Sequence, residues 1–338
     1  MKKPTAPVPA AEWERIKPDP FKKVCAEKMM ISAKVKGLSL GLFATLFWAS
    51  YYPAARFLFG EDADHCDPML LSLVRFTISG LFFLPFVLGS SARRRAFFPM
   101  VAKDWKALLG LTLSGVVIQG VLVFAALKYT TAARGSLLAN ASPIFTVIAA
   151  WLWLKEKISP GMLAGMVIGF AGIALAMFSR SSDMFMSSGA STFLGDMFAL
   201  LSGAAWAVYT VAGVRVVRTY DSLSVTMFTF LAGALMMPLV MVLFRSSFDF
   251  AAMTPRLWLG MVYMGVFTGG VAFMLWLRAL KYVPSSMLGA YGYLSALLAA
   301  FLSIVLLHEK LSGLFVFSAV MALGGMALMM RGGQKKDA

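Results

Sequence analysis

The sequence predicts an all-α, polytopic membrane protein with ten transmembrane helices in two inverted five-helix repeats. Composition is the first observation, because 59% of the 338 residues are hydrophobic, only 14% are charged and the mean hydropathy is +0.77. A soluble core does not need that much apolar surface, whereas a bilayer does. The second observation is a series of ten apolar runs of about 20 residues, the length of a spanning helix. The third is a stretch that occurs twice.

The repeated stretch covers residues 126–159 and recurs at 279–312, an offset of 153 residues. Nine of the 34 aligned positions are identical, and most of them lie at the two ends of the stretch. Both copies open on Ala-Leu-Lys-Tyr and close on Glu-Lys-x-Ser, and Gly172 still aligns with Gly325 beyond the copies. A repeat of this length predicts two homologous halves.

The chain begins with a basic, proline-rich segment that we expect to be a cytoplasmic tail. A signal peptide is not expected, because the first apolar run starts only at Leu38. Each later run must close its backbone hydrogen bonds internally in lipid and should therefore be a helix. The predicted spans are 38–59, 69–89, 106–127, 132–154, 161–178, 193–214, 222–244, 257–277, 283–307 and 313–330, with breaks at 60–68, 90–105, 179–192 and 245–256.

These spans divide the chain into five predicted parts. They are a cytoplasmic tail (1–36), a first five-helix repeat (37–178), an external linker (179–192), a second five-helix repeat (193–330) and a second cytoplasmic tail (331–338).

The distribution of Lys and Arg orients the spans. With the N-terminus in the cytoplasm, 23 of these residues fall in inside segments and five in outside segments, as the positive-inside rule requires. Both termini are therefore predicted to be cytoplasmic. Five spans, an odd number, separate each residue from its repeat partner, so the second half should enter the membrane upside down. Inverted repeats are typical of alternating-access transporters; a duplication that serves assembly alone is the alternative.

Other function classes find little support. The net charge of +15 does not indicate nucleic-acid binding, because the basic residues lie between and outside the apolar runs. Cys25 and Cys66 fall on opposite sides of the first span, so they cannot pair within one chain. The two histidines, His65 and His308, lie in loops, and the sequence has no metal-ligand cluster or nucleophile triad. We expect no enzyme activity, no cofactor and no metal, with an intramembrane enzyme as the most distant alternative.

Two motifs recur in both halves and carry a family resemblance. Trp48-Ala49-x-Tyr51 in the first span is echoed by Trp206-Ala207-x-Tyr209 in the sixth, and the Ala-Leu-x-Tyr entry, Pro143 and the Leu154-x-Glu156 close mark the fourth. Over about residues 38–330 the chain resembles the EamA-type domain of the drug/metabolite transporter superfamily. One departure is Ala296, which replaces the proline in the second copy, so a matching kink in the ninth span is not expected.

The resemblance implies a secondary transporter in the cell (inner or plasma) membrane that exports small metabolites, amino acids or related compounds. A nucleotide-sugar or sugar-phosphate antiporter is the alternative, and it would need cavity cations such as Arg134 and Arg75 for the phosphates. The expected partners are a small-molecule substrate and the lipid bilayer. A monomer would be sufficient, and the sequence sets no oligomeric state.

Helical spacing places Ser136, Asn140 and Pro143 on one face of the fourth span. The resemblance implies a central cavity between the third, fourth, eighth and ninth spans. Polar side chains there need a hydrogen-bond partner, which is either a substrate or another helix. The predicted cavity residues are Gln119, Arg134, Ser136, Asn140, Thr268, Trp276, Tyr291 and Tyr293.

Charged residues near the span ends have simpler interpretations. Arg134 lies in the first turn of the fourth span, where it can extend to the headgroups or turn inward toward a substrate carboxylate. Glu156 and Glu309 lie at span ends beside lysines and are predicted to be structural helix-end charges. No Asp or Glu lies in mid-span, which favours facilitated diffusion or exchange over a proton relay.

Overall fold

The computed structural model describes residues 20–50, 67–130, 132–178, 190–306 and 313–334, and these residues form helices and no β-strand. Nine helical segments among them are long and apolar enough to cross a membrane. They correspond to nine of the ten predicted spans. The first, predicted at 38–59, begins in the long helix α2 and continues into residues outside the described ranges. The protein is an all-helical, polytopic membrane protein, as predicted.

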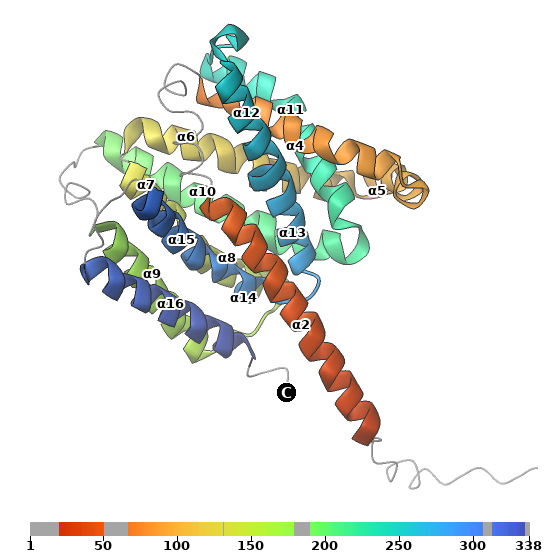
Figure 1. The fold of residues 1–338 in the computed structure, drawn as a ribbon, viewed down its shortest axis with the longest axis vertical. Helices are drawn as coiled ribbons and strands as arrows, with labels where there is room; N and C mark the ends of the chain where they lie inside the picture. The colour runs from red at the N-terminus through yellow and green to blue at the C-terminus, as the bar shows by residue number, and fades with distance from the viewer. Residues whose placement is uncertain (1–19, 51–66, 131, 179–189, 307–312, 335–338) are drawn as a thin grey trace, which may run out of the picture.

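The helices are labelled in Figure 1. They are α2 (Pro20–Ala49), α4 (Pro68–Leu88), α5 (Ser91–Leu111), α6 (Gln119–Tyr129), α7 (Ala132–Ala139), α8 (Ser142–Leu154), α9 (Pro160–Phe178), α10 (Ala190–Thr219), α11 (Ser222–Phe244), α12 (Pro255–Tyr263), α13 (Ala272–Ala279), α14 (Ser285–Gly289), α15 (Tyr291–Leu306) and α16 (Gly313–Gln334). The π-helical segments η2 (Thr112–Ile118) and η5 (Met264–Val271) interrupt the third and eighth spans, and a short 3-10 helix, η4 (Phe250–Ala252), precedes α12.

Helix starts follow their local sequence. α4 begins at Pro68, and the Asp67 carboxylate accepts the N–H of Met69 at 2.8 Å. α12 begins at Pro255, and the preceding Thr254 hydroxyl oxygen accepts an N–H of the first turn at 3.2 Å. The N–H groups of the first turn have no acceptor within the helix. Proline suits this position because it has no N–H, and the capping oxygen accepts one of the N–H groups that remain.

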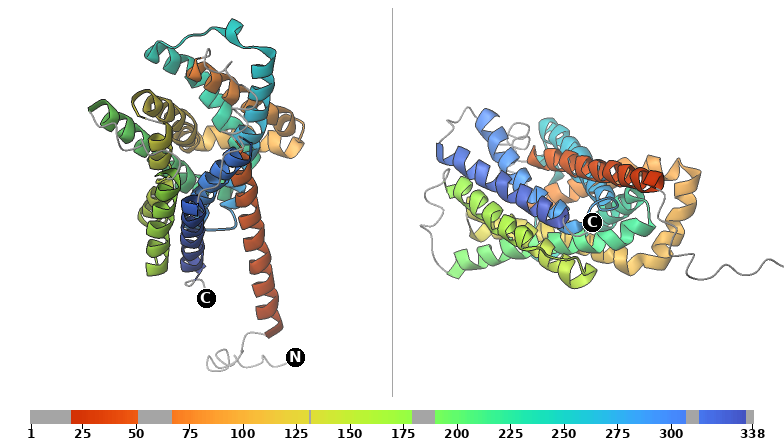
Figure 2. Two further views of the ribbon diagram at one scale, coloured as in Figure 1. Left: turned by 60° about the vertical axis from the view of Figure 1, so that its left-hand side comes forward. Right: turned by 90° about the horizontal axis from the view of Figure 1, so that it is seen from below.

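The packing of the helices follows the repeat. α9 lies along α16 and α4 along α11, so the fifth span pairs with the tenth and the second with the seventh (Figures 1 and 2). α2 packs against α13 and α15, and α10 packs against α6 and α8. α2 of the first span therefore contacts the eighth and ninth spans, and α10 of the sixth span contacts the third and fourth. Each set of contacts becomes the other when the two halves are exchanged.

Small residues bring α9 and α16 together. A Cβ on Gly165 would lie 2.5 Å from the Gly325 carbonyl oxygen, and one on Gly172 would lie 2.9 Å from the Ser318 carbonyl oxygen. These contacts are repeat-equivalent, because 165 aligns with 318 and 172 with 325. The two backbones therefore approach too closely for any side chain, as at small-residue interfaces between membrane helices.

Segments predicted to be cytoplasmic meet at one end of the molecule. The Lys36 ammonium lies 5.1 Å from the centroid of the Tyr282 ring, and its hydrogen bond lowers the pKa of Tyr282 below the ordinary value. Lys281 donates to the Tyr220 carbonyl at 2.9 Å, and Gly332 at the end of α16 lies against the start of α9. The start of α2 and the end of α16 point toward the same end (Figure 2).

Segments predicted to be external also contact one another in two places. The Thr130 hydroxyl donates to the Asp196 carboxylate at 3.0 Å, and the N–H of Ser247 donates to Asp67 at 3.0 Å. Asp196 lies near the start of α10, whereas Tyr220 follows its last residue. The external contact at Asp196 and the cytoplasmic contact at Tyr220 are thus separated by most of the length of this helix.

Two segments differ from the sequence-based expectation. Residues 90–105 were expected to be a break, but α5 runs through them and bends at Asp104, whose φ is −120°. The apolar face of this segment includes Met100, which packs inward at 2% exposure.

The ninth span, expected to lack a kink, is interrupted between α14 and α15 at Ala290, without a proline. Gly292 just beyond the break faces the ring of Pro143, where an added Cβ would be 3.1 Å away.

The glycine contact between α9 and α16 can be tested by a matched pair. A Cβ on Gly325 would lie 2.2 Å from the backbone nitrogen of Gly169, whereas a Cβ on the adjacent Gly324 would meet nothing within 4 Å. We expect Gly325→Ala to destabilise the protein by about 1–3 kcal/mol, since overpacking forces backbone shifts. Gly324→Ala should be neutral or slightly stabilising. Thermal unfolding in detergent would measure both, and equal melting temperatures would contradict this packing.

Candidate functional site

Aromatic side chains from both halves form one cluster between the helices. The indole rings of Trp48 on α2 and Trp206 on α10 lie edge to face, with centroids 5.1 Å apart. These residues open the recurring Trp-Ala-x-Tyr motif, so equivalent residues of the two halves touch. Trp276 and Phe273 of the eighth span complete the aromatic cluster, at 5.1 Å and 5.6 Å from Trp48. Such edge and offset arrangements are favourable for aromatic pairs.

The third and eighth spans are π-helical beside this cluster. η2 covers residues 112–118. The repeat offset of 153 places its equivalent at 265–271, and η5 covers these residues and one more at its start. π-helical turns are rare and are often found at functional sites. These turns were not predicted from the sequence. Glycines at Gly115, Gly269 and Gly270 were the available signal, but hydropathy does not distinguish a π turn from an α turn.

The same repeat position loses its regular hydrogen bond in both π segments. The N–H of Gln119 is directed at the carbonyls of Ser114 and Val116 and skips that of Gly115. The N–H of Ala272 likewise skips the carbonyl of Thr268, the repeat partner of Gly115.

The other half contacts each irregular turn. The Trp48 indole N–H donates to the skipped Thr268 carbonyl at 2.9 Å. Gly115 lies under the Tyr209 ring, where an added Cβ would be 2.2 Å from a ring carbon. Each π segment therefore packs against the motif helix of the opposite half.

Four of the predicted cavity residues are buried and bonded to protein groups. Thr268 donates to the Met264 carbonyl within its own helix at 2.8 Å. The other three bond to other helices: Trp276 to the Thr210 hydroxyl at 3.2 Å, Tyr291 to the Leu38 carbonyl at 3.0 Å and Tyr293 to the Met166 carbonyl at 3.0 Å. In this conformation a substrate would have to displace these bonds to use the same atoms.

The remaining predicted residues are less enclosed or less fully described. Gln119 is half-buried where η2 passes into α6, and Asn140 is half-buried at the break between α7 and α8. The side chains of Arg134 and Ser136 lie outside the described part of the chain, as does Glu309. The structure therefore brings Thr268 and Trp276 together around Trp48, while Tyr293 lies in a separate apolar cluster with α9 and α16.

Glu156 accepts four hydrogen bonds from two serines of the other half. The N–H and hydroxyl of Ser285 donate to one carboxylate oxygen at 3.1 Å and 2.8 Å. The N–H of Ser286 donates to the other oxygen at 3.2 Å, and its hydroxyl does so as well. α8 ends at Leu154, and the next residue, Lys155, is left-handed (φ 57°), which turns the chain toward α14. We call Glu156, Ser285 and Ser286 the Glu156 clasp.

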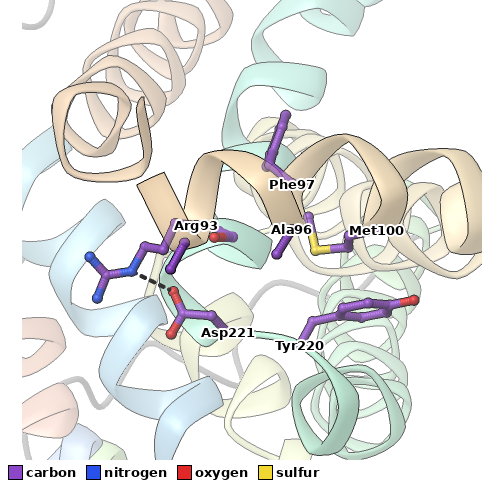
Figure 3. Close-up of a pocket in the computed structure, with 8 residues that line it drawn as sticks. Arg93, Ala96, Phe97, Met100, Tyr220 and Asp221 are labelled. Carbon is purple, nitrogen blue, oxygen red and sulfur yellow. Dashed lines mark hydrogen bonds and ion pairs between the residues drawn. The ribbon is translucent and has the colours of Figure 1, made fainter. Parts of the chain in front are cut away.

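A pocket of about 220 Å³ lies away from these residues, between the start of α5 and the turn from α10 to α11 (Figure 3). Phe97 and Met100 line it, and the ion pair of Arg93 with Asp221 closes one side at 3.2 Å. Tyr220 lines the other side, and its hydrogen bond to Asp104 raises its pKa above the ordinary value.

Among the described residues, no three His, Cys, Asp or Glu side chains come together as metal ligands.

Comparisons with known proteins agree with one another. The model of the EamA-like transporter family matches residues 35–178 and 193–331. The chain is 28% identical over 262 residues to an uncharacterized transporter of Archaeoglobus fulgidus, covering 78% of this chain and 87% of that protein. It is 24% identical over 289 residues to the aromatic amino acid exporter YddG of Ancylobacter novellus, covering 86% and 95%. A solved crystal structure shares the fold with a TM-score of 0.76, at 23% identity, over 91% of this chain and 99% of that one.

Two buried tyrosines provide a matched test of the hydrogen bonds. Tyr293→Phe removes the bond to Met166 and should lower the free energy of unfolding by about 1 kcal/mol. The Tyr209 hydroxyl is buried without a hydrogen-bond partner among the described residues, so Tyr209→Phe should be neutral or stabilising. Thermal unfolding followed by tryptophan fluorescence would compare them. A larger loss in Tyr209→Phe would show that its hydroxyl has a partner.

Proposed function

The chain belongs to the EamA-like transporter family, and from this membership we propose that it is a secondary, alternating-access transporter exporting small metabolites, in particular amino acids or related compounds. The observation that carries the proposal is the family match, which covers both halves. The halves also share an irregular feature at equivalent positions, the π-helical turns of the third and eighth spans.

In this proposal the two halves are inverted repeats of five spans each. The exchange symmetry of the packing supports it, because the contacts of α2 and α10 interconvert when the halves are swapped. The gathering of Lys36, Tyr220 and Tyr282 at one end supports cytoplasmic placement of those loops and of both termini. In this proposal that end faces the cytoplasm, which the excess of basic residues favours, and the membrane is the cell membrane.

Transport would proceed by exchange of the two packings around a central substrate. The π-helical turns suit this role because a helix with one extra residue in a turn can shift register without losing all its hydrogen bonds. The substrate would lie between the third, fourth, eighth and ninth spans, where the predicted cavity residues Gln119 and Asn140 are half-buried. Arg134 would attract a substrate carboxylate.

The substrate class rests on two supports. The relative in Ancylobacter novellus is named an aromatic amino acid exporter. In addition, the aromatic cluster of Trp48, Trp206, Phe273 and Trp276 would present ring faces and edges to an aromatic side chain once the packing of the two halves changes, since its rings contact one another in this conformation. Aromatic amino acids are therefore the first compounds to test, followed by other zwitterions.

Orientation is tested by cysteine labelling in a background without Cys25 and Cys66. Phe98 on α5 is 67% exposed, and Ser247 in the loop after α11 is also exposed. A membrane-impermeant thiol reagent should label Ser247→Cys in intact cells and Phe98→Cys only after permeabilisation. The reverse pattern would overturn the proposed orientation.

Export is tested by loading cells that overexpress the protein with labelled amino acids and following their efflux. We expect faster efflux than in cells with the vector alone. Arg134→Gln should reduce efflux of carboxylate-bearing substrates about tenfold or more, because a charge-assisted hydrogen bond is lost, and Arg134→Lys should restore part of it.

Neutral analogues without a carboxylate provide the control for this series, since their efflux should not depend on Arg134. Unchanged amino-acid efflux in Arg134→Gln at equal membrane abundance would make Arg134 a lipid anchor. Absence of efflux for every amino acid would overturn the substrate class.

A further inference from the structure

The Glu156 clasp joins the two halves at one end of the fourth and ninth spans. We propose that Glu156 is a gating residue: its carboxylate holds the cytoplasmic ends of these spans together, and the clasp must open before the cavity can face the cytoplasm. This inference rests on the proposed transport function and adds to it a named contact that differs between the two states.

The clasp is a fully bonded carboxylate. Each oxygen of Glu156 receives one N–H and one O–H, and the donors Ser285 and Ser286 are 0% and 3% exposed. Hydrogen bonds to a charged acceptor are about twice as strong as neutral ones. The left-handed Lys155 that follows the end of α8 positions Glu156, whose N–H donates back to the Ala150 carbonyl at 3.2 Å.

The contact above the clasp is made largely by small and apolar groups. A Cβ on Gly289 would lie 3.1 Å from the Thr146 methyl carbon, and Gly292 faces the ring of Pro143. Such surfaces can separate and close again without leaving buried charges unpaired. The charged clasp is therefore the part of this interface whose strength decides how often its cytoplasmic end opens.

The clasp is also asymmetric between the halves. At an offset of 153, Glu156 aligns with Glu309, whereas Ser285 and Ser286 align with Ala132 and Ala133. The two hydroxyl donors of the cytoplasmic clasp thus have no counterpart in the repeat. This difference in sequence biases the resting protein toward the form seen here, in which the fourth and ninth spans are joined at this end.

The proposal differs from a purely structural role in what it predicts. If Glu156 only stabilises the fold, its removal should lower the melting temperature. It should not change how accessible the interface between the fourth and ninth spans is to a reagent on either side of the membrane. A gate would change the exposure of buried groups above it. Thr146 is a suitable reporter because it is 1% exposed and lies against Gly289, above the clasp.

The experiment follows labelling of Thr146→Cys by a membrane-impermeant maleimide in inside-out vesicles, with Cys25 and Cys66 replaced by Ser. With Glu156 intact the thiol should react slowly. Glu156→Gln should speed its labelling about tenfold, since charge-assisted bonds are lost. The double variant Ser285→Ala, Ser286→Ala keeps the carboxylate and both N–H groups, and it should speed labelling about threefold.

Asp221→Asn is the matched control. It removes a carboxylate at the same end whose partner is the half-exposed Arg93, and it should leave the labelling rate of the Thr146→Cys thiol unchanged. Melting temperatures measured in parallel separate opening from unfolding. If Glu156→Gln does not fold, the double serine variant carries the test.

Unchanged labelling in both clasp variants, with the melting temperature lowered, would overturn the gating role and leave a structural contact. Faster labelling from the opposite face of the membrane would support the clasp and reverse the proposed orientation. Because labelling needs no substrate, it distinguishes failure of the gate from failure of the proposed export function.

Discussion

A backbone carbonyl that leaves the helical ladder inside a bilayer needs a donor from the protein, and this requirement connects the two halves. The Thr268 carbonyl is skipped by the N–H of Ala272 and accepts the indole N–H of Trp48 from the first span. The irregular turn of the second half is thus completed by the first. Gly115, at the equivalent turn of the first half, is covered by Tyr209 of the second. Any change in how the halves pack must therefore alter these turns.

Hydropathy predicted the spans well because a bilayer imposes one length and one hydrogen-bonding pattern on every helix. The predicted run 222–244 coincides with α11. The predicted run 161–178 differs from α9 only in starting one residue later. The irregularities could not be predicted in the same way. The break at Ala290 has no proline, and the π turns have no characteristic composition. At each of these irregularities a side chain of the other half contacts the helix: Pro143 faces Gly292, Tyr209 covers Gly115 and Trp48 bonds to Thr268. Such contacts are tertiary and leave only a weak local signal.

The candidate site, like the fold, could be predicted from the sequence only in part. The sequence identified Tyr291 and Tyr293 as polar groups in one span, but residues two apart on a helix point in nearly opposite directions. Tyr291 bonds to Leu38 on α2 and Tyr293 to Met166 on α9. Which of them faces a substrate depends on the rotation of the helix, and rotation is decided by packing. The role of Glu156 as a helix-end charge was read from its position, whereas its partners, Ser285 and Ser286, lie 129 and 130 residues away.

Two kinds of contact between the halves have different consequences for alternating access. The seam of α9 and α16 maps onto itself when the halves are exchanged, since the contact of Gly165 with Gly325 becomes that of Ser318 with Gly172. A contact with this symmetry is compatible with both packings and can persist while they exchange. The Glu156 clasp lacks it, because its serine donors have alanines as repeat partners. In a transporter built from such halves, the symmetric apolar seam is the part that can stay fixed, and an asymmetric charged contact at one end is the part that has to break.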